Sequence, residues 1–313
     1  MSPTNTDPIV TTAGVMMTLS GISYVQPVDA AAFMAELNNA TYATQGKWEL
    51  VWGPAWEQTW DNVVYVARLT GTSTYAVVVR GTDYTPFGLD TLGQAYEDLA
   101  VGQQVTFGYG SPAGASIATG TLTGLTELVD QKGWTQGDTQ VYEALLEFLI
   151  SAAPETIYVT GHSLGGCLST VLAPWIKFQL NQGGITPAMF AYTFAAPTAG
   201  NLAFADWYTN NSNITSYRFF NTIDLVPMAW ADLAGMKLLF SPNPGASIGL
   251  KLIIDGVSLW LSDRDKVIYV QPNGPGNPLK NNPTPGQNWF DEVGTQHGHN
   301  TYLMLLGATQ VDF

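Results

Sequence analysis

A Gly-x-Ser-x-Gly sequence, Gly161-His162-Ser163-Leu164-Gly165, constrains the fold of this chain more than any other feature. An apolar run of β-branched and aromatic residues, 157–159, precedes it, and a helical apolar pattern follows it directly. A strand, a sharp turn and a helix in this order hold the serine hydroxyl out at the carboxyl end of a strand, where open α/β sheets bind their ligands. The sequence therefore predicts Ser163 as a nucleophile. The alternative is a serine that only caps the following helix.

Continuously apolar segments alternate with helical patterns along the chain. Residues 75–79 are apolar throughout, as expected for a strand covered on both faces. Residues 189–195 form another predicted buried strand, and residues 214–220 a further one. This alternation predicts an α/β fold with a mostly parallel sheet flanked by helices on both faces. A chain of 313 residues can bury one large core, so we expect a single domain over residues 1–313.

The remaining segments follow less regular patterns. Residues 1–27 read as a loose lead-in. Helices are predicted at about 113–131 and 138–152, the second with Asp138 as its N-cap. A further strand is expected at 266–271, followed by a loop rich in proline, glycine and asparagine at 273–285.

The charge of the chain excludes several kinds of partner. A formal net charge of −14 and a pI near 4.3 argue against nucleic acid and against anionic membrane surfaces. A neutral or cationic small molecule and an uncharged lipid surface remain compatible. The sequence has no cysteine–histidine cluster with zinc spacing and no calcium loop, so no metal or cofactor is expected. Cys167, the only cysteine, is expected to be a small packed side chain.

The N-terminal segment gives little information about location. Residues 1–7 lack the basic region of a signal peptide, and residues 11–25 are too short and too polar to span a bilayer. We expect no transmembrane segment. The sequence does not decide between a cytoplasmic protein and the mature form of a secreted one.

A serine hydroxyl becomes a nucleophile only when a base, oriented by a third group, removes its proton. The chain contains three histidines. His162 lies inside the turn, where its side chain is expected to point away from Ser163, so we interpret it as structural. His297 and His299, which precede the last predicted helix at 302–306, are the candidates for the base.

The acid should follow a strand between the serine and the histidine. Asp224 comes directly after the predicted strand 214–220 and is the favoured candidate. The oxyanion of an ester transition state also needs two donors. The backbone N–H of Leu164 is one, and Thr82, which follows the strand 75–79, is the predicted second. The other acidic residues weighed for the same role follow no comparably clear strand: Asp232, Asp255, Asp263 and Asp265.

Four motifs in this order resemble the class 3 lipase family, which includes the fungal triacylglycerol lipases. The resemblance implies an α/β-hydrolase fold, with Ser163 as nucleophile, Asp224 as acid, and Thr82 and Leu164 as the oxyanion hole. Asp98-Leu99 resembles the pair that follows the lid of the family, which implies a structural role. The motifs are Val79-Arg-Gly-Thr82, Val159-Thr-Gly-His-Ser-Leu-Gly-Gly166, Phe194-Ala-Ala-Pro-Thr-Ala-Gly-Asn201 and Asn221-Thr-Ile-Asp-Leu-Val-Pro227.

The chain departs from the family pattern in two segments. A lid is expected at about 84–98, but residues 84–96 lack the tryptophan of the fungal lids. The stretch from Asp224 to His297 is long, which predicts an inserted element at about 228–262. The family places its histidine in either of two registers, one selecting His299 and the other His297, and we favour His297.

The expected activity is that of a serine carboxylic ester hydrolase. A lipase that cleaves acylglycerols or similar apolar esters through an acyl-enzyme, with transient contact to a lipid interface, is the leading hypothesis. Within the same chemistry the alternatives are an esterase for soluble esters, a feruloyl-type esterase and a phospholipase A1. An alternative from another class is a hydrolase scaffold that serves as a non-catalytic binding module.

Overall fold

The computed structural model of the chain describes residues 7–56, 62–82, 100–263 and 267–313. The expected lid at about 84–98 and the pair Asp98-Leu99 lie outside the described residues.

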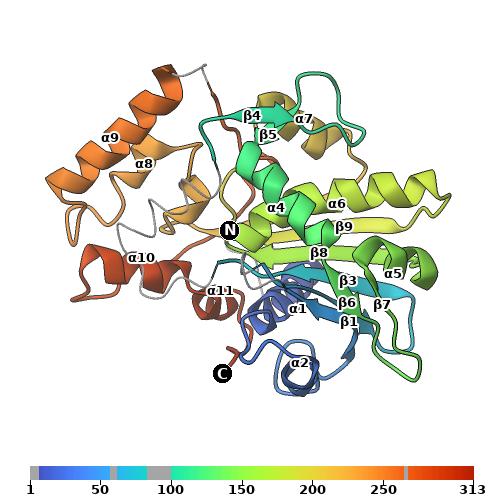
Figure 1. Ribbon diagram of the computed structural model, residues 1–313. Coiled ribbons are helices and arrows are strands. Elements are labelled where there is room, and N and C mark those ends of the chain that lie inside the picture. Colours follow the sequence, from blue (N-terminus) through green and yellow to red (C-terminus); the bar gives the residue numbers. More distant parts are fainter. Residues whose placement is uncertain (1–6, 57–61, 83–99, 264–266) are drawn as a thin grey trace.

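Seven strands form the central sheet, in the order β1-β2-β3-β8-β9-β10-β11. The first three strands pair antiparallel, and every neighbouring pair from β3 to β11 is parallel. The predicted architecture, a mostly parallel sheet with helices on both faces, is confirmed (Figure 1). The strands are β1 Trp48–Ala55, β2 Val64–Leu69, β3 Thr74–Val79, β8 Thr156–His162, β9 Ala188–Phe194, β10 Thr215–Asn221 and β11 Asn277–Leu279.

Both faces of the sheet are covered because side chains alternate between them along each strand. Val77 and Val159 point to one face, where they pack with α4, α5, α6 and α7. Val78 and Phe194 point to the other, where they pack with α1, α2 and α11. The helices are α1 Pro8–Ile22, α2 Ala30–Leu37, α4 Thr119–Asp130, α5 Leu145–Ala152, α6 Leu164–Gln182, α7 Leu202–Asn210 and α11 His299–Leu305.

Helix α1 shows that the prediction of a loose lead-in at residues 1–27 was wrong. The carboxylate of Asp7 caps the helix by accepting a hydrogen bond from the backbone N–H of Ile9 at 2.8 Å, and Pro8 suits the first helical position. All residues from Met16 to Ile22 are buried. A helix buried on all sides has no alternation of apolar and polar residues at helical spacing, so its sequence gave no periodic signal.

Two predicted helices, a predicted strand and a predicted loop also differ from the structure. Strand β5, Ser116–Ala118, pairs with β4, Gln104–Thr106, so the helix expected from residue 113 begins only at Thr119. Strand β7, Tyr142–Ala144, pairs with β6, Lys132–Trp134.

Helix α5 therefore begins at Leu145, not at residue 138. The carboxylate of Glu147 accepts the backbone N–H of Ala144 at 3.0 Å, so Asp138 is not the N-cap. Residues 267–271, the described part of the strand expected at 266–271, lie outside the sheet. Strand β11 falls instead in the predicted loop at 273–285. It is an edge strand and therefore tolerates Pro278, whose missing N–H made the segment read as a loop.

Three helices lie together beyond the end of the sheet at which α6 begins, on the left in Figure 1. The first two fall in the segment predicted as an inserted element, about 228–262. No helix in the described part of the chain has the length and apolar character needed to cross a membrane. The three helices are α8 Leu233–Met236, α9 Ile248–Asp263 and α10 Trp289–His297.

Candidate active site

The candidate site is built on the turn between β8 and α6. Ser163 has φ 61° and ψ −131°, a backbone conformation that side chains rarely adopt and that local packing must enforce. Its N–H donates to the carbonyl of Phe194 at 2.9 Å, and its carbonyl accepts the N–H of Gly166 at 2.9 Å. The turn is therefore fixed by the neighbouring strand β9 as well as by its own helix.

Two glycines of the motif are required because backbone atoms occupy the space of a side chain. A Cβ on Gly161 would lie 2.3 Å from the carbonyl oxygen of Gly165. A Cβ on Gly165 would lie 2.2 Å from the carbonyl oxygen of Val79 in β3. The Gly-x-Ser-x-Gly pattern thus reflects close packing of three backbone segments at the serine.

The imidazole of His297 bridges Ser163 and Asp224. Its Nε2 lies 2.8 Å from Oγ of Ser163, and its Nδ1 lies 2.9 Å from Oδ2 of Asp224. A carboxylate can only accept a hydrogen bond, so Nδ1 carries the proton and Nε2 is free to accept the serine hydroxyl proton. This arrangement can transfer the proton of Ser163 to His297 while Asp224 holds the ring.

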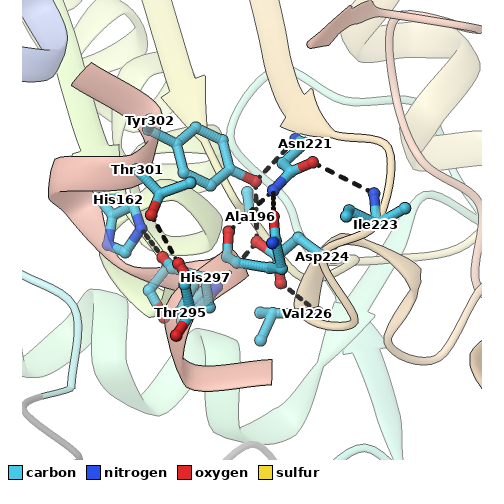
Figure 2. Close-up of polar contacts among 12 residues, drawn as sticks. His162, Ala196, Asn221, Ile223, Asp224, Val226, Thr295, His297, Thr301 and Tyr302 are labelled. Carbon is cyan, nitrogen blue, oxygen red and sulfur yellow. Dashed lines mark hydrogen bonds and ion pairs between the residues drawn. The ribbon is translucent and has the colours of Figure 1, made fainter. Parts of the chain in front are cut away.

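Asp224 is completely buried, and hydrogen bonds offset the cost of burying its charge. Its Oδ1 accepts the backbone N–H of Val226 at 2.9 Å, and its Oδ2 accepts the hydroxyl of Tyr302 at 2.8 Å (Figure 2). The same hydroxyl accepts the backbone N–H of Asn221 at 2.9 Å. Burial and the charge of Asp224 hold the pKa of Tyr302 well above its ordinary value, so the phenol remains a donor.

A second set of hydrogen bonds joins the last residue of β10 to the last turn of α10. The side-chain amide of Asn221 donates to the carbonyl of Gln296 at 3.0 Å and to its Oε1 at 2.7 Å. The amide of Gln296 donates to the buried carboxylate of Glu292 at 2.7 Å. Since Gln296 precedes His297, these bonds fix the backbone from which the base projects. These contacts were not predicted from the sequence. The spacing of four between Glu292 and Gln296, which places two side chains on one face of a helix, is a signal that could have found the contact between these two residues.

His162 packs against the base rather than against the serine hydroxyl. Its Nε2 lies 2.7 Å from the backbone carbonyl of His297, and its Nδ1 lies 3.1 Å from the hydroxyl of Tyr24. Because a carbonyl only accepts, Nε2 carries the proton and Nδ1 accepts from Tyr24. Burial, assisted by the charges of His297 and His299, lowers the pKa of His162 well below its ordinary value. The imidazole is therefore a neutral support for the backbone of His297.

His299 lies in a different environment from His297. Its ring stacks on Tyr24, with ring centroids 5.1 Å apart, and lies 6.4 Å from the ring of Phe313. Sequence reasoning did not anticipate Tyr24, since it lies in the segment that was predicted as a loose lead-in.

The predicted oxyanion donors lie on either side of Ser163. Leu164 is the first residue of α6, where backbone N–H groups have no partner within the helix. A Cβ on Gly81 would lie 2.8 Å from Cβ of Ser163, so the loop after β3 that carries Thr82 runs directly past the serine. The backbone of Leu164 and that of Gly81, the residue before Thr82, are therefore next to Ser163.

The remaining candidates have other surroundings. Asp232 caps α8 by accepting the backbone N–H of Gly235 at 2.8 Å, and Asp255 pairs with Lys237. The side chains of Asp263 and Asp265 lie outside what the structure describes. Burial raises the pKa of Cys167 to about 12, which makes it an unreactive packed thiol. Among the described residues, no group of three or more histidine, cysteine or carboxylate side chains could hold a metal ion.

The fold and the Ser–His–Asp geometry define an α/β-hydrolase with a serine hydrolase site. The model of the family described as "Lipase (class 3)" matches residues 76–233, about half of the chain, and the chain belongs to this family. The predicted resemblance is therefore confirmed.

The individual proteins to which the chain is similar are also named as lipases. The structure is similar to the crystal structure of M37 lipase, with a TM-score of 0.75 and 26% identity over 96% of this chain and 92% of that one. A triacylglycerol lipase whose catalytic centre is formed by a serine protease triad has a TM-score of 0.51 at 23% identity, over 73% of this chain and 76% of that one, and shares the fold. In sequence, the chain is 28% identical to the secreted mono- and diacylglycerol lipase A of Penicillium cyclopium over 125 residues. That alignment spans 38% of this chain and 39% of the relative.

Proposed function

We propose that the protein is a serine carboxylic ester hydrolase, a lipase that cleaves acylglycerols or similar apolar esters. The observation that carries the proposal is the bridge made by His297, 2.8 Å from Ser163 and 2.9 Å from Asp224. Membership of the class 3 lipase family supports the same chemistry.

The proposed reaction has two halves. The hydroxyl of Ser163 attacks the ester carbonyl while Nε2 of His297 takes its proton, and Asp224 stabilises the imidazolium. Backbone N–H groups of Leu164 and Thr82 hold the oxyanion. The tetrahedral intermediate expels the alcohol, which receives the proton from His297, and leaves an acyl group on Ser163. In the second half, His297 removes a proton from water, the hydroxide attacks the acyl carbonyl, and the carboxylic acid leaves as the proton returns to Ser163.

The substrate class rests on the family and on its members. The Penicillium relative is named as a lipase of mono- and diacylglycerols, and the similar solved structures are named as lipases. We propose acylglycerols as substrates on this basis, with a transient contact between the protein and the lipid phase.

Hydrolysis of esters below and above their solubility limit tests the proposal. We expect the wild type to release fatty acid from emulsified mono-, di- and triacylglycerols faster than from short soluble esters, and Ser163→Ala to be inactive on both. A preference for short soluble esters with no gain above the solubility limit would make the protein an esterase. No hydrolysis of any ester would favour the non-catalytic binding module.

We also propose a location and a domain organisation. The Penicillium relatives are named as secreted, which supports a secreted protein over a cytoplasmic one. Immunoblots of the medium and of the cells would decide. One domain over residues 1–313, with a lid at about 84–98 and an inserted element at about 228–262, should give a single calorimetric unfolding transition that Ser163→Ala leaves unchanged.

A further inference from the structure

Helix α9 carries apolar side chains on two different sides. Leu250 and Ile254 are buried, with 4% and 5% of their surface exposed. Ile248 and Leu252, which are one turn apart, are 81% and 65% exposed. At 3.6 residues per turn the two buried residues lie on one side of the helix and the two exposed residues on the opposite side. We call Ile248 and Leu252 the outer face of α9.

The buried side of α9 packs on the segments that carry the candidate site. It shares a cluster with Leu225, the residue after Asp224, and with Val293 of α10, the helix that ends at His297. Further along, Val257 and Leu261 join a second cluster that includes Leu164. The helix therefore packs on segments next to the acid, the base and the oxyanion segment, and it lies beyond the end of the sheet at which α6 begins (Figure 1).

The charges on α9 are few and partly neutralised. Asp255 forms an ion pair with Lys237, which follows α8, and Lys251 is exposed on the same helix. The chain as a whole carries a net charge of −14. A surface with little charge in a strongly acidic protein favours an uncharged partner. The rest of the molecule repels anionic surfaces, and the side chains described on this face form no acidic cluster that would attract a cationic one.

We infer that the outer face of α9 docks the protein on the surface of uncharged lipid, with the candidate site turned towards the aggregate that supplies its substrate. The inference rests on the proposed lipase function. The family match ends at residue 233, before α9 begins, so the docking helix belongs to this chain rather than to the matched part of the family. A helix with an exposed apolar face binds a lipid surface by sinking that face to the level of the acyl chains.

Vesicles of diether phosphatidylcholine, which contain no ester to hydrolyse, provide the test. The full-length wild type should co-float with them and should bind diether phosphatidylglycerol vesicles less, because that lipid is anionic. The double variant Ile248→Gln/Leu252→Gln should bind phosphatidylcholine about 10- to 100-fold more weakly, as expected when two aliphatic side chains no longer enter an apolar phase.

A matched control separates docking from general loss of apolar surface. Leu202→Gln/Ile150→Gln removes two side chains that are 55% and 47% exposed on α7 and α5. This control should bind vesicles as the wild type does. Both double variants should keep wild-type activity on a short soluble ester, while only the α9 variant should lose at least 10-fold on emulsified triacylglycerol.

Three outcomes would overturn the inference. They are vesicle binding by the α9 variant equal to that of the control, no vesicle binding by the wild type, and a wild-type dimer in sedimentation velocity that the α9 substitutions dissociate. In the last case a second copy of the chain covers the outer face. Failure of the proposed function is distinct, since the wild type would then hydrolyse neither soluble nor emulsified esters, whatever its binding to vesicles.

Discussion

The serine turn and helix α9 lie at the same end of the molecule, yet their surroundings constrain them very differently. At Gly165 a Cβ would lie 2.2 Å from a carbonyl oxygen of β3. At Gly256, in the middle of α9, a Cβ would meet no atom within 4 Å. The turn is enclosed by three backbone segments, whereas one side of α9 is open.

This difference follows from what each region must do. Proton transfer and oxyanion stabilisation depend on atoms held at hydrogen-bond distance, so the site needs a backbone with no freedom. Contact with a fluid lipid surface needs apolar area but no fixed partner atoms. The two regions should therefore respond to substitution in opposite ways.

The largest contrast is expected between the two neighbouring histidines of the C-terminal segment. His297→Ala removes the proposed base and should lower kcat on a soluble ester by about 10³-fold or more. His299→Ala removes a ring that stacks on Tyr24 and should change kcat by no more than a few-fold. Steady-state kinetics of both variants checks this, with circular dichroism to confirm folding. Equal losses, or a larger loss at His299, would exclude His297 as the base.

A pair of glycine substitutions compares the two regions directly. Gly165→Ala should destabilise the fold by about 3 kcal/mol or more, because its methyl group would overlap backbone that cannot move away. Gly256→Ala should stabilise it by about 0.5–1 kcal/mol, since alanine restricts the unfolded chain and meets open space. Urea unfolding of both variants measures the two changes. Equal free energies of unfolding for the two variants would contradict the claim that the serine turn is more tightly enclosed than α9.

The buried imidazole of His162 should make stability depend on pH. Its pKa is lowered in the folded protein, so below the ordinary value of about 6.5 the unfolded chain takes up a proton that the folded one refuses. The stabilising contribution of the neutral His162 to the free energy of unfolding is fully present above a pH of about 6.5. Below that pH the free energy of unfolding should fall by about 1.4 kcal/mol per pH unit, until the pH reaches the pKa of His162 in the folded protein.

His162→Gln keeps a hydrogen-bond donor but cannot titrate. Its free energy of unfolding should therefore fall less steeply between pH 6.5 and pH 5.5 than that of the wild type, in parallel urea titrations. Identical slopes for the two proteins would show that His162 is not held neutral.

A more modest loss of catalysis than that of His297→Ala is expected at Tyr302. Tyr302→Phe removes one of the hydrogen bonds to the buried carboxylate of Asp224 and should cost about 1–2 kcal/mol of transition-state stabilisation, or roughly 10-fold in kcat. KM on a soluble ester should stay unchanged, because the hydroxyl touches the acid and not the substrate. A change in KM with unaltered kcat would argue against this positioning role.

The sequence predicted the parts of the molecule that local chemistry dictates. Buried parallel strands read as continuous apolar runs, and the tight packing at Gly161 and Gly165 left a glycine pattern around Ser163. Asp224 was identifiable because it directly follows a strand. Each of these features is encoded within a few neighbouring residues.

Other features depend on contacts between distant segments and could not be predicted. Helix α1 is buried on all sides from Met16 to Ile22 and shows no periodicity. Tyr24 reaches His162 from the far end of the chain, and the choice of His297 over His299 depends on where α10 ends. The outer face of α9 left no interpretable pattern either, since a helix that is apolar on two sides does not alternate with a polar face.

A structure of the protein with an organophosphonate on Ser163 tests the central claim most directly. We expect phosphorus bonded to Oγ of Ser163, with a phosphonyl oxygen about 2.7–3.1 Å from the backbone nitrogens of Leu164 and Thr82. We also expect Nε2 of His297 within hydrogen-bond distance of the adduct. A phosphonate on another residue, or an adduct whose nearest imidazole belongs to His299, would contradict this claim.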